Sequence, residues 1–142
     1  MNKLKTCHND SMSRTSKVWK TVKLDVRPWG EMTMLEQRPR WWVKKISVNP
    51  GSRTSLQKHA QRSELWHVVE GEIQAIVMGK SGKTSVKKIK AGTTLSVPPQ
   101  VPHRIASKNG AVLIEIGYGA PSERDIVRLE DDYGRAGKAP KK

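Results

Sequence analysis

The chain has 142 residues, a formal net charge of +14, one cysteine and 35% hydrophobic residues. This length suits a single domain with its own core, and a lone cysteine, Cys7, excludes an internal disulfide. Because no apolar run approaches the roughly 20 residues that span a bilayer, and the N-terminus has no apolar signal segment, we expect a cytoplasmic protein without a membrane partner.

The positive charge gathers at the two ends of the chain. Residues 1–24 carry six Lys/Arg against one Asp, and residues 135–142 carry four Lys/Arg and no acid, so nine of the fourteen charges lie there. A nucleic-acid-binding domain would place its basic surface on the folded part. We therefore predict no specific nucleic-acid partner, and basic ends that bind polyanions only in a loose, salt-dependent way.

In chain order, residues 1–24 are predicted to form a basic leader or dimerisation arm, with Trp19 and Leu24 among its few apolar anchors. Residues 25–134 are predicted to be an all-β domain, because Val-, Ile- and Thr-rich segments alternate with turn residues about every 8–12 positions. The strands are expected at 41–48, 65–69, 73–78, 84–89, 93–97 and 111–116, with turns at 49–51, 70–72, 79–83, 90–92, 98–99 and 108–110. Residues 123–133 are expected to pack back onto the barrel as a short strand or turn, and 135–142 to be a disordered tail.

One group of residues suggests chemistry. Gln57 and His59 are two positions apart and share a strand face, Glu64 follows, and His103 can come from a neighbouring strand. Imidazole nitrogens, a carboxylate and an amide oxygen together suit one divalent ion, with Zn preferred and Mn, Co, Ni or Fe as alternatives. Taken singly, each residue also has a structural interpretation, as a hydrogen-bonded core histidine or a surface Gln or Glu.

The spacing of these residues resembles two cupin motifs. The first is Gly51-x5-Gln57-x-His59-x4-Glu64-x6-Gly71, and the second is Gly92-x5-Pro98-x4-His103-x5-Asn109. Three further stretches resemble the type II phosphomannose isomerase family, namely RPWG at 27–30, SLQKHAQRSELW at 55–66 and DIVRLEDDYGR at 125–135. That module usually forms the C-terminal part of bifunctional mannose-6-phosphate isomerase/mannose-1-phosphate guanylyltransferases.

The resemblance covers residues 25 to 135 and implies a double-stranded β-helix, the jelly-roll-like cupin barrel. It also implies a metal site made of Gln57, His59, Glu64 and His103. The family usually has a second histidine where this chain has Gln61, so Gln61 is either a weak fifth ligand or a group behind the ligands. The 24 leading residues are too short for a nucleotidyltransferase domain, so guanylyltransferase activity is not expected.

The implied function is a metal-dependent isomerase that interconverts mannose 6-phosphate and fructose 6-phosphate. Arg62 is assigned to the phosphate, with an ion pair to Glu64 as its structural alternative. The sequence does not identify the base; Lys58, Arg104 and a metal-bound water are candidates. The alternative functions are a non-catalytic metal- and sugar-binding cupin and, less favoured, a dioxygenase-like cupin. A homodimer is expected from the general tendency of open sheet edges to pair.

The remaining polar and aromatic residues are expected to be structural. His67 has the opposite strand parity to Glu64 and is placed on the outer face. Trp41 and Trp42 are assigned to the core, whereas Trp66 is left open between core and site, and Trp29 also has a possible sugar-stacking role. The lysines expected on solvent faces are Lys44, Lys45, Lys87, Lys88 and Lys90.

Overall fold

The computed structural model describes residues 22–138, so residues 1–21 of the predicted leader, Trp19 among them, and residues 139–142 of the predicted tail lie outside the described range. Within it the chain forms strands and turns without a helix, so no described segment could cross a membrane as a helix. The strands are β1 Leu24–Arg27, β2 Gly30–Arg38, β3 Trp41–Val48, β4 Ser52–Arg53, β5 Leu56–Lys58, β6 Ser63–Met78, β7 Thr84–Lys90, β8 Thr94–Val97, β9 His103–Ser107, β10 Ala111–Tyr118 and β11 Val127–Glu130.

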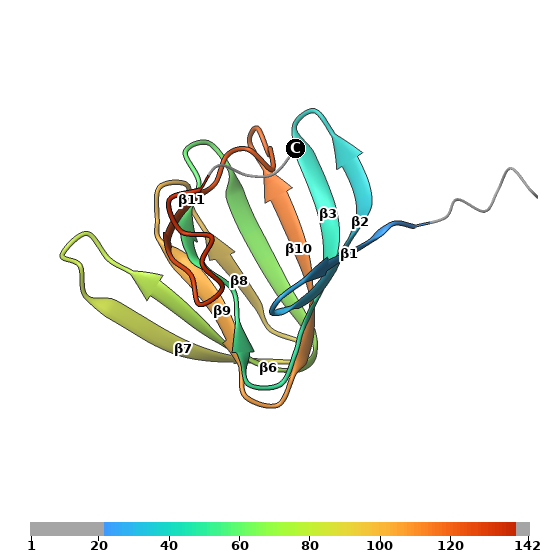
Figure 1. Cartoon of the computed structure of the whole chain (residues 1–142). Coiled ribbons are helices and arrows are strands. Elements are labelled where there is room, and N and C mark those ends of the chain that lie inside the picture. Colours follow the sequence, from blue (N-terminus) through green and yellow to red (C-terminus); the bar gives the residue numbers. More distant parts are fainter. Residues whose placement is uncertain (1–21, 139–142) are drawn as a thin grey trace, which may run out of the picture.

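The strands form one curled antiparallel sheet in the order β1-β2-β3-β10-β6-β9-β5-β11, with β7 and β8 also paired to β6 and β4 to β9 (Figure 1). Curling brings the half built on β3 and β10 opposite the half built on β5 and β9. The predicted all-β class is thereby confirmed. The last strand, β11, pairs with β5, so the expected return of residues 123–133 onto the barrel is confirmed too.

The long strand β6 corrects the turn predicted at 70–72. The chain stays extended through Gly71, whose φ of 75° lies in the left-handed region. A Cβ at this position would lie 2.5 Å from the carbonyl oxygen of Gly110, which only glycine avoids. Before Gly71 the strand pairs with β10 and β8, and after it with β7 and β9. The glycine therefore marks the point where one strand passes from one half of the sheet to the other.

The inward-facing residues change from apolar to charged along the barrel. Read across β3, β10 and β6, the successive rows are Val48–Ala111–Gly71, Ile46–Leu113–Val68, Lys44–Glu115–Trp66 and Trp42–Gly117–Glu64. Lys44 is only 3% exposed, so its assignment to a solvent face was wrong. Strand alternation puts it on the same face as Trp42 and Ile46, and its cross-strand partner is Glu115. The charged rows mark one end of the barrel as the place to look for a site.

Most of the other face assignments are confirmed. Trp42 is buried, as expected, and the four other lysines are exposed; Trp66, which was left open between core and site, is buried and also lines the pocket. His67 lies outside, where its Nδ1 is 2.8 Å from the Thr94 hydroxyl. Trp41 is the exception: it begins β3 on the outward parity and is 41% exposed, so it does not belong to the core.

Candidate metal centre

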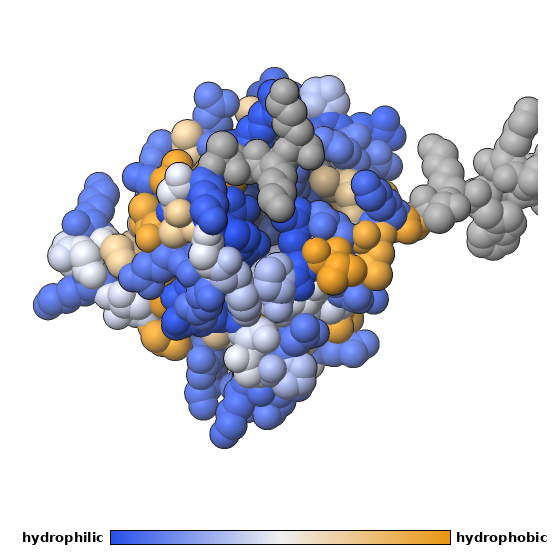
Figure 2. Space-filling model, viewed as in Figure 1, coloured by the Kyte–Doolittle hydropathy of each residue, from blue (hydrophilic) through white to orange (hydrophobic). Residues whose placement is uncertain are grey.

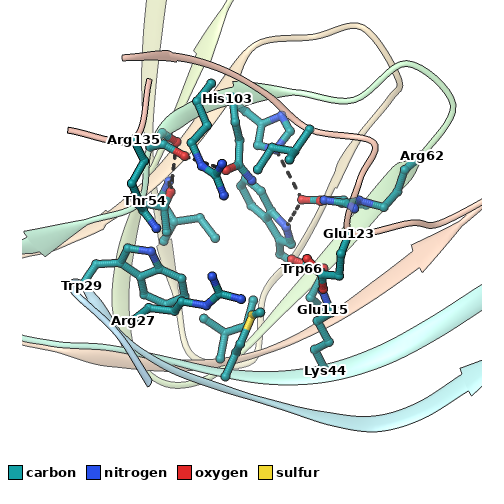
Figure 3. Close-up of a pocket in the computed structure, with 18 residues that line it drawn as sticks. Arg27, Trp29, Lys44, Thr54, Arg62, Trp66, His103, Glu115, Glu123 and Arg135 are labelled. Carbon is teal, nitrogen blue, oxygen red and sulfur yellow. Dashed lines mark hydrogen bonds and ion pairs between the residues drawn. The ribbon is translucent and has the colours of Figure 1, made fainter. Parts of the chain in front are cut away.

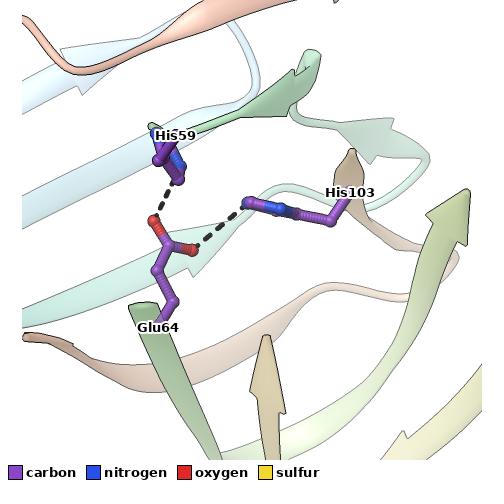
Figure 4. Close-up of side chains that lie close together, drawn as sticks. All are labelled: His59, Glu64 and His103. Carbon is purple, nitrogen blue, oxygen red and sulfur yellow. Dashed lines mark ion pairs between the residues drawn. The ribbon is translucent and has the colours of Figure 1, made fainter. Parts of the chain in front are cut away.

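Three buried side chains from separate strands meet at the charged end of the barrel. His59 directly follows β5, Glu64 is the second residue of β6, and His103 begins β9 (Figure 4). Their ligand atoms all lie within 4.8 Å of one another, and the residues are 2%, 1% and 2% exposed. The structure thus brings together three of the four residues proposed as ligands, including the two histidines 44 positions apart.

Both histidines are held in the same tautomer by backbone carbonyls. Nδ1 of His59 lies 2.5 Å from the Asp125 carbonyl oxygen, and Nδ1 of His103 lies 2.8 Å from that of Val101. A carbonyl oxygen only accepts, so each Nδ1 donates, and in a neutral ring the lone pair is left on Nε2. The two Nε2 atoms lie 2.9 and 3.3 Å from the oxygens of Glu64. A lone pair facing a carboxylate calls for a proton or a metal ion between them.

This arrangement fits a divalent metal ion. Metal-binding histidines commonly donate the other ring N–H to a carbonyl or carboxylate, which fixes the orientation of the ring. Nε2 of His103 is buried and has no hydrogen-bond partner among the described residues. Two imidazoles and one carboxylate suit a first-row divalent ion. His59, Glu64 and His103 can therefore hold a metal.

The charge of Glu64 is stabilised from several sides. Its Oε2 accepts a hydrogen bond of 3.0 Å from the Trp66 indole, and its Oε1 accepts one of 2.9 Å from Nε of Arg62. Burial opposes ionisation, but the close contacts of Glu64 with His103 and His59 and the charge of Arg62 hold the Glu64 pKa well below its usual range. Glu64 raises the pKa of His103 in return, against the effect of burial. The carboxylate is thus ionised and available as a ligand.

Arg62 is part of this centre and is fully engaged by it. It is 4% exposed, with Nη1 bonded to the Ser122 carbonyl at 2.9 Å and its guanidinium carbon 4.6 Å from the Trp42 ring centroid. Nη2 lies 2.8 Å from Nε2 of His59, the atom that a metal would use. Arg62 therefore has to withdraw from His59 when an ion binds. The ion pair with Glu64 is the arrangement that the structure shows.

The other predicted site residues differ in how they are placed relative to the centre. Gln57 pairs with His103 across the strands and lines the pocket, but its amide oxygen accepts a hydrogen bond from Ser55 at 2.7 Å. Lys58 has the opposite parity on β5 and is not among the residues that line the pocket. Gln61 is exposed on the loop after His59. The structure therefore does not bring Lys58 or Gln61 to the centre.

Asp125 braces the loop that carries His59. Its carboxylate accepts backbone hydrogen bonds from Ala60, Gln61 and Arg62 at 2.7, 2.9 and 3.1 Å, while its carbonyl accepts from His59. Although burial opposes it, these hydrogen bonds hold the Asp125 pKa below its usual range. The sequence analysis did not assign this role, although Asp125 opens the motif at 125–135. One residue thus fixes both the ring and the loop of a ligand.

A second charged cluster lies beside the centre and was missed from the sequence. Glu115 is 6% exposed; its Oε1 accepts from the Trp42 indole at 3.2 Å and lies 4.0 Å from Nζ of Lys44, which also pairs with Glu123. Burial, and then the charge of Glu64, raises the pKa of Glu115. The sequence did contain a signal that Glu115 faces inward, because this residue has the same strand parity as Ala111 and Leu113.

These clusters line a pocket with two compartments. The inner one has a volume of about 70 Å³, and Glu64, His103, Glu115 and Arg62 contribute to its wall (Figure 3). The outer one measures about 810 Å³ and shares six residues with it, namely Arg27, Met32, Lys44, Glu123, Arg128 and Arg135. Such an outer volume is in the range of small-molecule sites.

Relatives are found for most of the chain. A family model described as mannose-6-phosphate isomerase C-terminal matches residues 14–131. The xanthan biosynthesis protein XanB of Xanthomonas campestris pv. campestris and the alginate biosynthesis protein AlgA of Pseudomonas aeruginosa are each 38% identical over 112 residues, and a mannose-1-phosphate guanylyltransferase of Salmonella montevideo is 36% identical. Each match covers 77% of this chain but only 22–23% of the relative, so the chain spans less than a quarter of their length.

Solved structures with a similar fold are more distant in sequence. Oxalate decarboxylase from Bacillus subtilis aligns with a TM-score of 0.68 and 17% identity, over 76% of this chain and 30% of that one. Another structure of that enzyme concerns its Mn(II) centres. CapF, solved with an inhibitor, aligns with a TM-score of 0.69 and 18% identity, over 78% and 35%. At such identity the likeness shows the fold, and it confirms the predicted cupin barrel. With the family model matching residues 14–131, the chain belongs to the C-terminal mannose-6-phosphate isomerase family and has the cupin fold.

Proposed function

We propose that this chain is a metal-dependent sugar-phosphate isomerase that interconverts mannose 6-phosphate and fructose 6-phosphate. The observation that carries the proposal is the pair of histidine Nε2 atoms directed at Glu64, together with a second buried carboxylate, Glu115, which lines the same pocket as Glu64 and His103. Aldose–ketose isomerisation needs both a centre that stabilises negative charge on the sugar oxygens and a base that moves a proton. The family to which the chain belongs supports the same choice of reaction.

His59, Glu64 and His103 would hold the ion, and Gln57 lies close enough in the fold to be a further ligand once its contact with Ser55 opens. When bound, a divalent ion supplies positive charge that polarises the sugar oxygens. We keep Zn as the first choice for the ion. Mn is a specific alternative, because oxalate decarboxylase, which shares the fold, has Mn(II) centres.

Glu115 is the proposed base. Its raised pKa makes the carboxylate a better proton acceptor than an ordinary glutamate, which suits general base catalysis near neutral pH. Both polar contacts of its carboxylate within residues 22–138, with Trp42 and Lys44, involve Oε1. This assignment replaces Lys58, which does not line the pocket.

The reaction then balances with one proton carried by Glu115. The carboxylate removes the proton from C2 of the aldose, the C2–H electrons form a C1=C2 bond, and the carbonyl oxygen at C1 becomes an oxyanion. The protonated carboxyl returns the proton to C1, while the hydroxyl at C2 loses its proton to O1 and becomes the new carbonyl. The low exposure of Glu115 limits exchange of the carried proton with water.

A coupled assay tests the proposal. Mannose 6-phosphate is supplied to the protein loaded with Zn, Co or Mn, and fructose 6-phosphate is measured. Turnover should require the ion, stop with a chelator, and fall at least 100-fold in Glu64→Gln and Glu115→Gln. Glu36→Gln is the matched control, because Glu36 lies on β2, 44% exposed, outside the pocket. An unchanged rate in Glu115→Gln would refute the assignment of Glu115 as the base. No turnover with any of the three ions would refute the proposed isomerase activity.

The second candidate is a non-catalytic metal- and sugar-binding cupin. It is favoured by Arg62, which occupies the Nε2 side of His59, and by Gln61, which is exposed where the family usually has a histidine. This candidate predicts that the protein binds the metal tightly, with the ion retained after gel filtration, but produces no fructose 6-phosphate.

We also propose that two copies of the chain pair through β1. Among residues 22–138 this strand ends the sheet, and Leu24 and Val26 on it are 50% and 74% exposed; Figure 2 shows this hydrophobic patch where the described chain begins. Exposed edge strands are commonly covered by a symmetric copy. Light scattering should give the mass of a dimer, and a monomer at every concentration would contradict the pairing.

A further inference from the structure

Three arginines gather where the inner and outer compartments of the pocket meet. Arg27 ends β1, Arg128 lies in β11, and Arg135 follows β11, yet all three line both compartments. Figure 3 shows the Arg27 guanidinium reaching into the pocket opposite Glu115 and Lys44. Segments from both ends of the domain thus contribute cations to one junction.

The hydrogen bonds of these arginines are incomplete. Nη2 of Arg27 pairs with Asp25 at 2.5 Å, but its Nε is buried without a hydrogen-bond partner. Nε of Arg128 is also buried and unpaired, and no acidic residue within 22–138 forms a salt bridge with Arg128. Arg135, by contrast, is held by two bonds to Asp131, at 2.9 and 2.6 Å. A buried donor without an acceptor destabilises the folded chain, so two such donors at one junction favour the binding of an acceptor there.

The surroundings favour an anion as that acceptor. Six basic residues line the outer compartment, namely Lys23, Arg27, Lys44, Arg128, Arg135 and Lys138. Its two acidic residues, Asp25 and Glu123, are already paired with Arg27 and Lys44. Burial, and then the positive charge of Arg135, lowers the pKa of Arg128; Arg27 acts in the same direction, whereas Asp131 and Glu123 oppose it.

Arg62 cannot supply this anion site in the arrangement observed. Its three guanidinium nitrogens contact Glu64, Ser122 and His59, and the group is buried under these contacts. We propose instead that Arg27 and Arg128 form the subsite for the phosphate group of a phosphorylated sugar. The inference rests on the proposed function for the sugar, but it assigns the phosphate to the junction of the two compartments.

The volumes of the two compartments agree with a phosphate group at their junction and the reacting end of the sugar in the inner one. The inner compartment, at about 70 Å³, has room for only part of a sugar, and it contains Glu64 and Glu115. The outer compartment, at about 810 Å³, holds the rest. A dianion at the junction gives the unpaired guanidinium donors their acceptors and leaves the reacting carbons on the side of the buried carboxylates.

Binding of inorganic phosphate tests the subsite without any need for turnover. We compare wild type, Arg27→Gln, Arg128→Gln and the control Arg38→Gln, whose arginine is 61% exposed and pairs with Glu36 away from the pocket. Calorimetry at fixed ionic strength should show phosphate binding at least tenfold weaker in Arg27→Gln and Arg128→Gln and unchanged in Arg38→Gln. Phosphate should also raise the melting temperature of wild type but not of Arg128→Gln. Arg128→Lys, which keeps the charge, should bind phosphate with intermediate affinity.

The outcomes separate this inference from the proposed reaction. If wild type binds phosphate through these arginines yet turns over no mannose 6-phosphate, the subsite stands and the isomerase does not. If the isomerase is active, KM for mannose 6-phosphate should rise at least tenfold in Arg128→Gln with a much smaller change in kcat. Equal phosphate binding in wild type, Arg27→Gln and Arg128→Gln overturns the subsite, and so does an equal loss in Arg38→Gln, because the binding would then reflect net charge alone.

Discussion

Replacing Asp125 with alanine should weaken metal binding although Asp125 contributes no ligand atom. Its carboxylate accepts three backbone hydrogen bonds from residues 60–62, between the ligands His59 and Glu64. Alanine removes all three acceptors while the backbone carbonyl of residue 125 remains. The loop then gains freedom, and the His59 ring loses the fixed support of that carbonyl.

The size of the effect follows from these contacts. A hydrogen bond to a charged group contributes about 1.5–3 kcal/mol when it is buried. Ala60 and Gln61 are exposed, so water replaces much of what the carboxylate provides. We therefore expect a loss of about 2 kcal/mol in the free energy of unfolding, equivalent to roughly 6 °C in Tm. Metal affinity should fall about 10- to 100-fold, as for other residues that orient metal ligands.

Calorimetric titration with Zn and thermal melts in the presence of a chelator measure the two effects separately. Asp132→Ala is the matched control, because Asp132 lies in the same C-terminal motif but pairs with the exposed Arg53. It should leave both the unfolding free energy and the metal affinity nearly unchanged, because an exposed ion pair contributes little to stability. Since the Asp125 pKa is lowered in the folded protein, its contribution is complete above about pH 5 and is lost as the pH falls through the folded pKa. Wild-type metal affinity in Asp125→Ala would refute the bracing role.

Three further predictions concern the interior of the barrel. Lys44→Met removes the buried cation next to Glu115, so the pKa of that carboxyl should rise further. The acidic limb of the pH profile of kcat/KM should then move to higher pH, and an unchanged limb would exclude Glu115 as the base. Metal affinity should increase by at least tenfold from pH 5.5 to pH 7.5, because both ligand histidines must be neutral to bind and the pKa of one of them is raised in the metal-free protein; a flat titration series would argue against imidazole ligands. Gly117→Ala should lower the unfolding free energy by more than about 2 kcal/mol, since its Cβ would lie 2.3 Å from the buried Trp42 indole nitrogen, and a chemical denaturation curve that superimposes on wild type would contradict this packing.

The strands that the sequence indicated are those with regular apolar content. The segment 41–48 matches β3 residue for residue, and 111–116 lies within β10. Strands β2 and β9 were not predicted, because GEMTMLEQR and HRIAS contain few of the residues that mark a strand and owe their conformation to pairing with β3 and β6. The turn predicted at 70–72 was wrong because Gly71 lies where β6 passes from one half of the sheet to the other. The local sequence does not distinguish such a passage from a turn that reverses the chain.

The candidate ligands could be predicted because both signals used for them, strand parity and motif spacing, can be read directly from residue positions in the sequence. Lys44 was misplaced because it was judged by residue type, which puts charged side chains at the surface, and Glu115 was not considered. Their parity with Ile46 and Leu113 already put them inside, and the register of β3 with β10 pairs them directly. The role of Asp125 could not be derived in this way, because it depends on a contact between segments 63–65 positions apart that no local pattern encodes.

The arginines of the pocket can be ranked by how much of their hydrogen-bonding capacity the protein itself uses. Arg62 has the residues of the metal centre as partners, so its charge balances Glu64 and keeps that carboxylate from being a buried unpaired anion when no ion is bound. A sugar phosphate that bound Arg62 would have to break these bonds. Glu64 would then be a buried anion without its cationic partner. Arg27 and Arg128 have unpaired buried donors, so an incoming anion gains their hydrogen bonds without dismantling the centre. The inner arginine thus maintains the metal site, and the outer two are the ones free to recognise a phosphate.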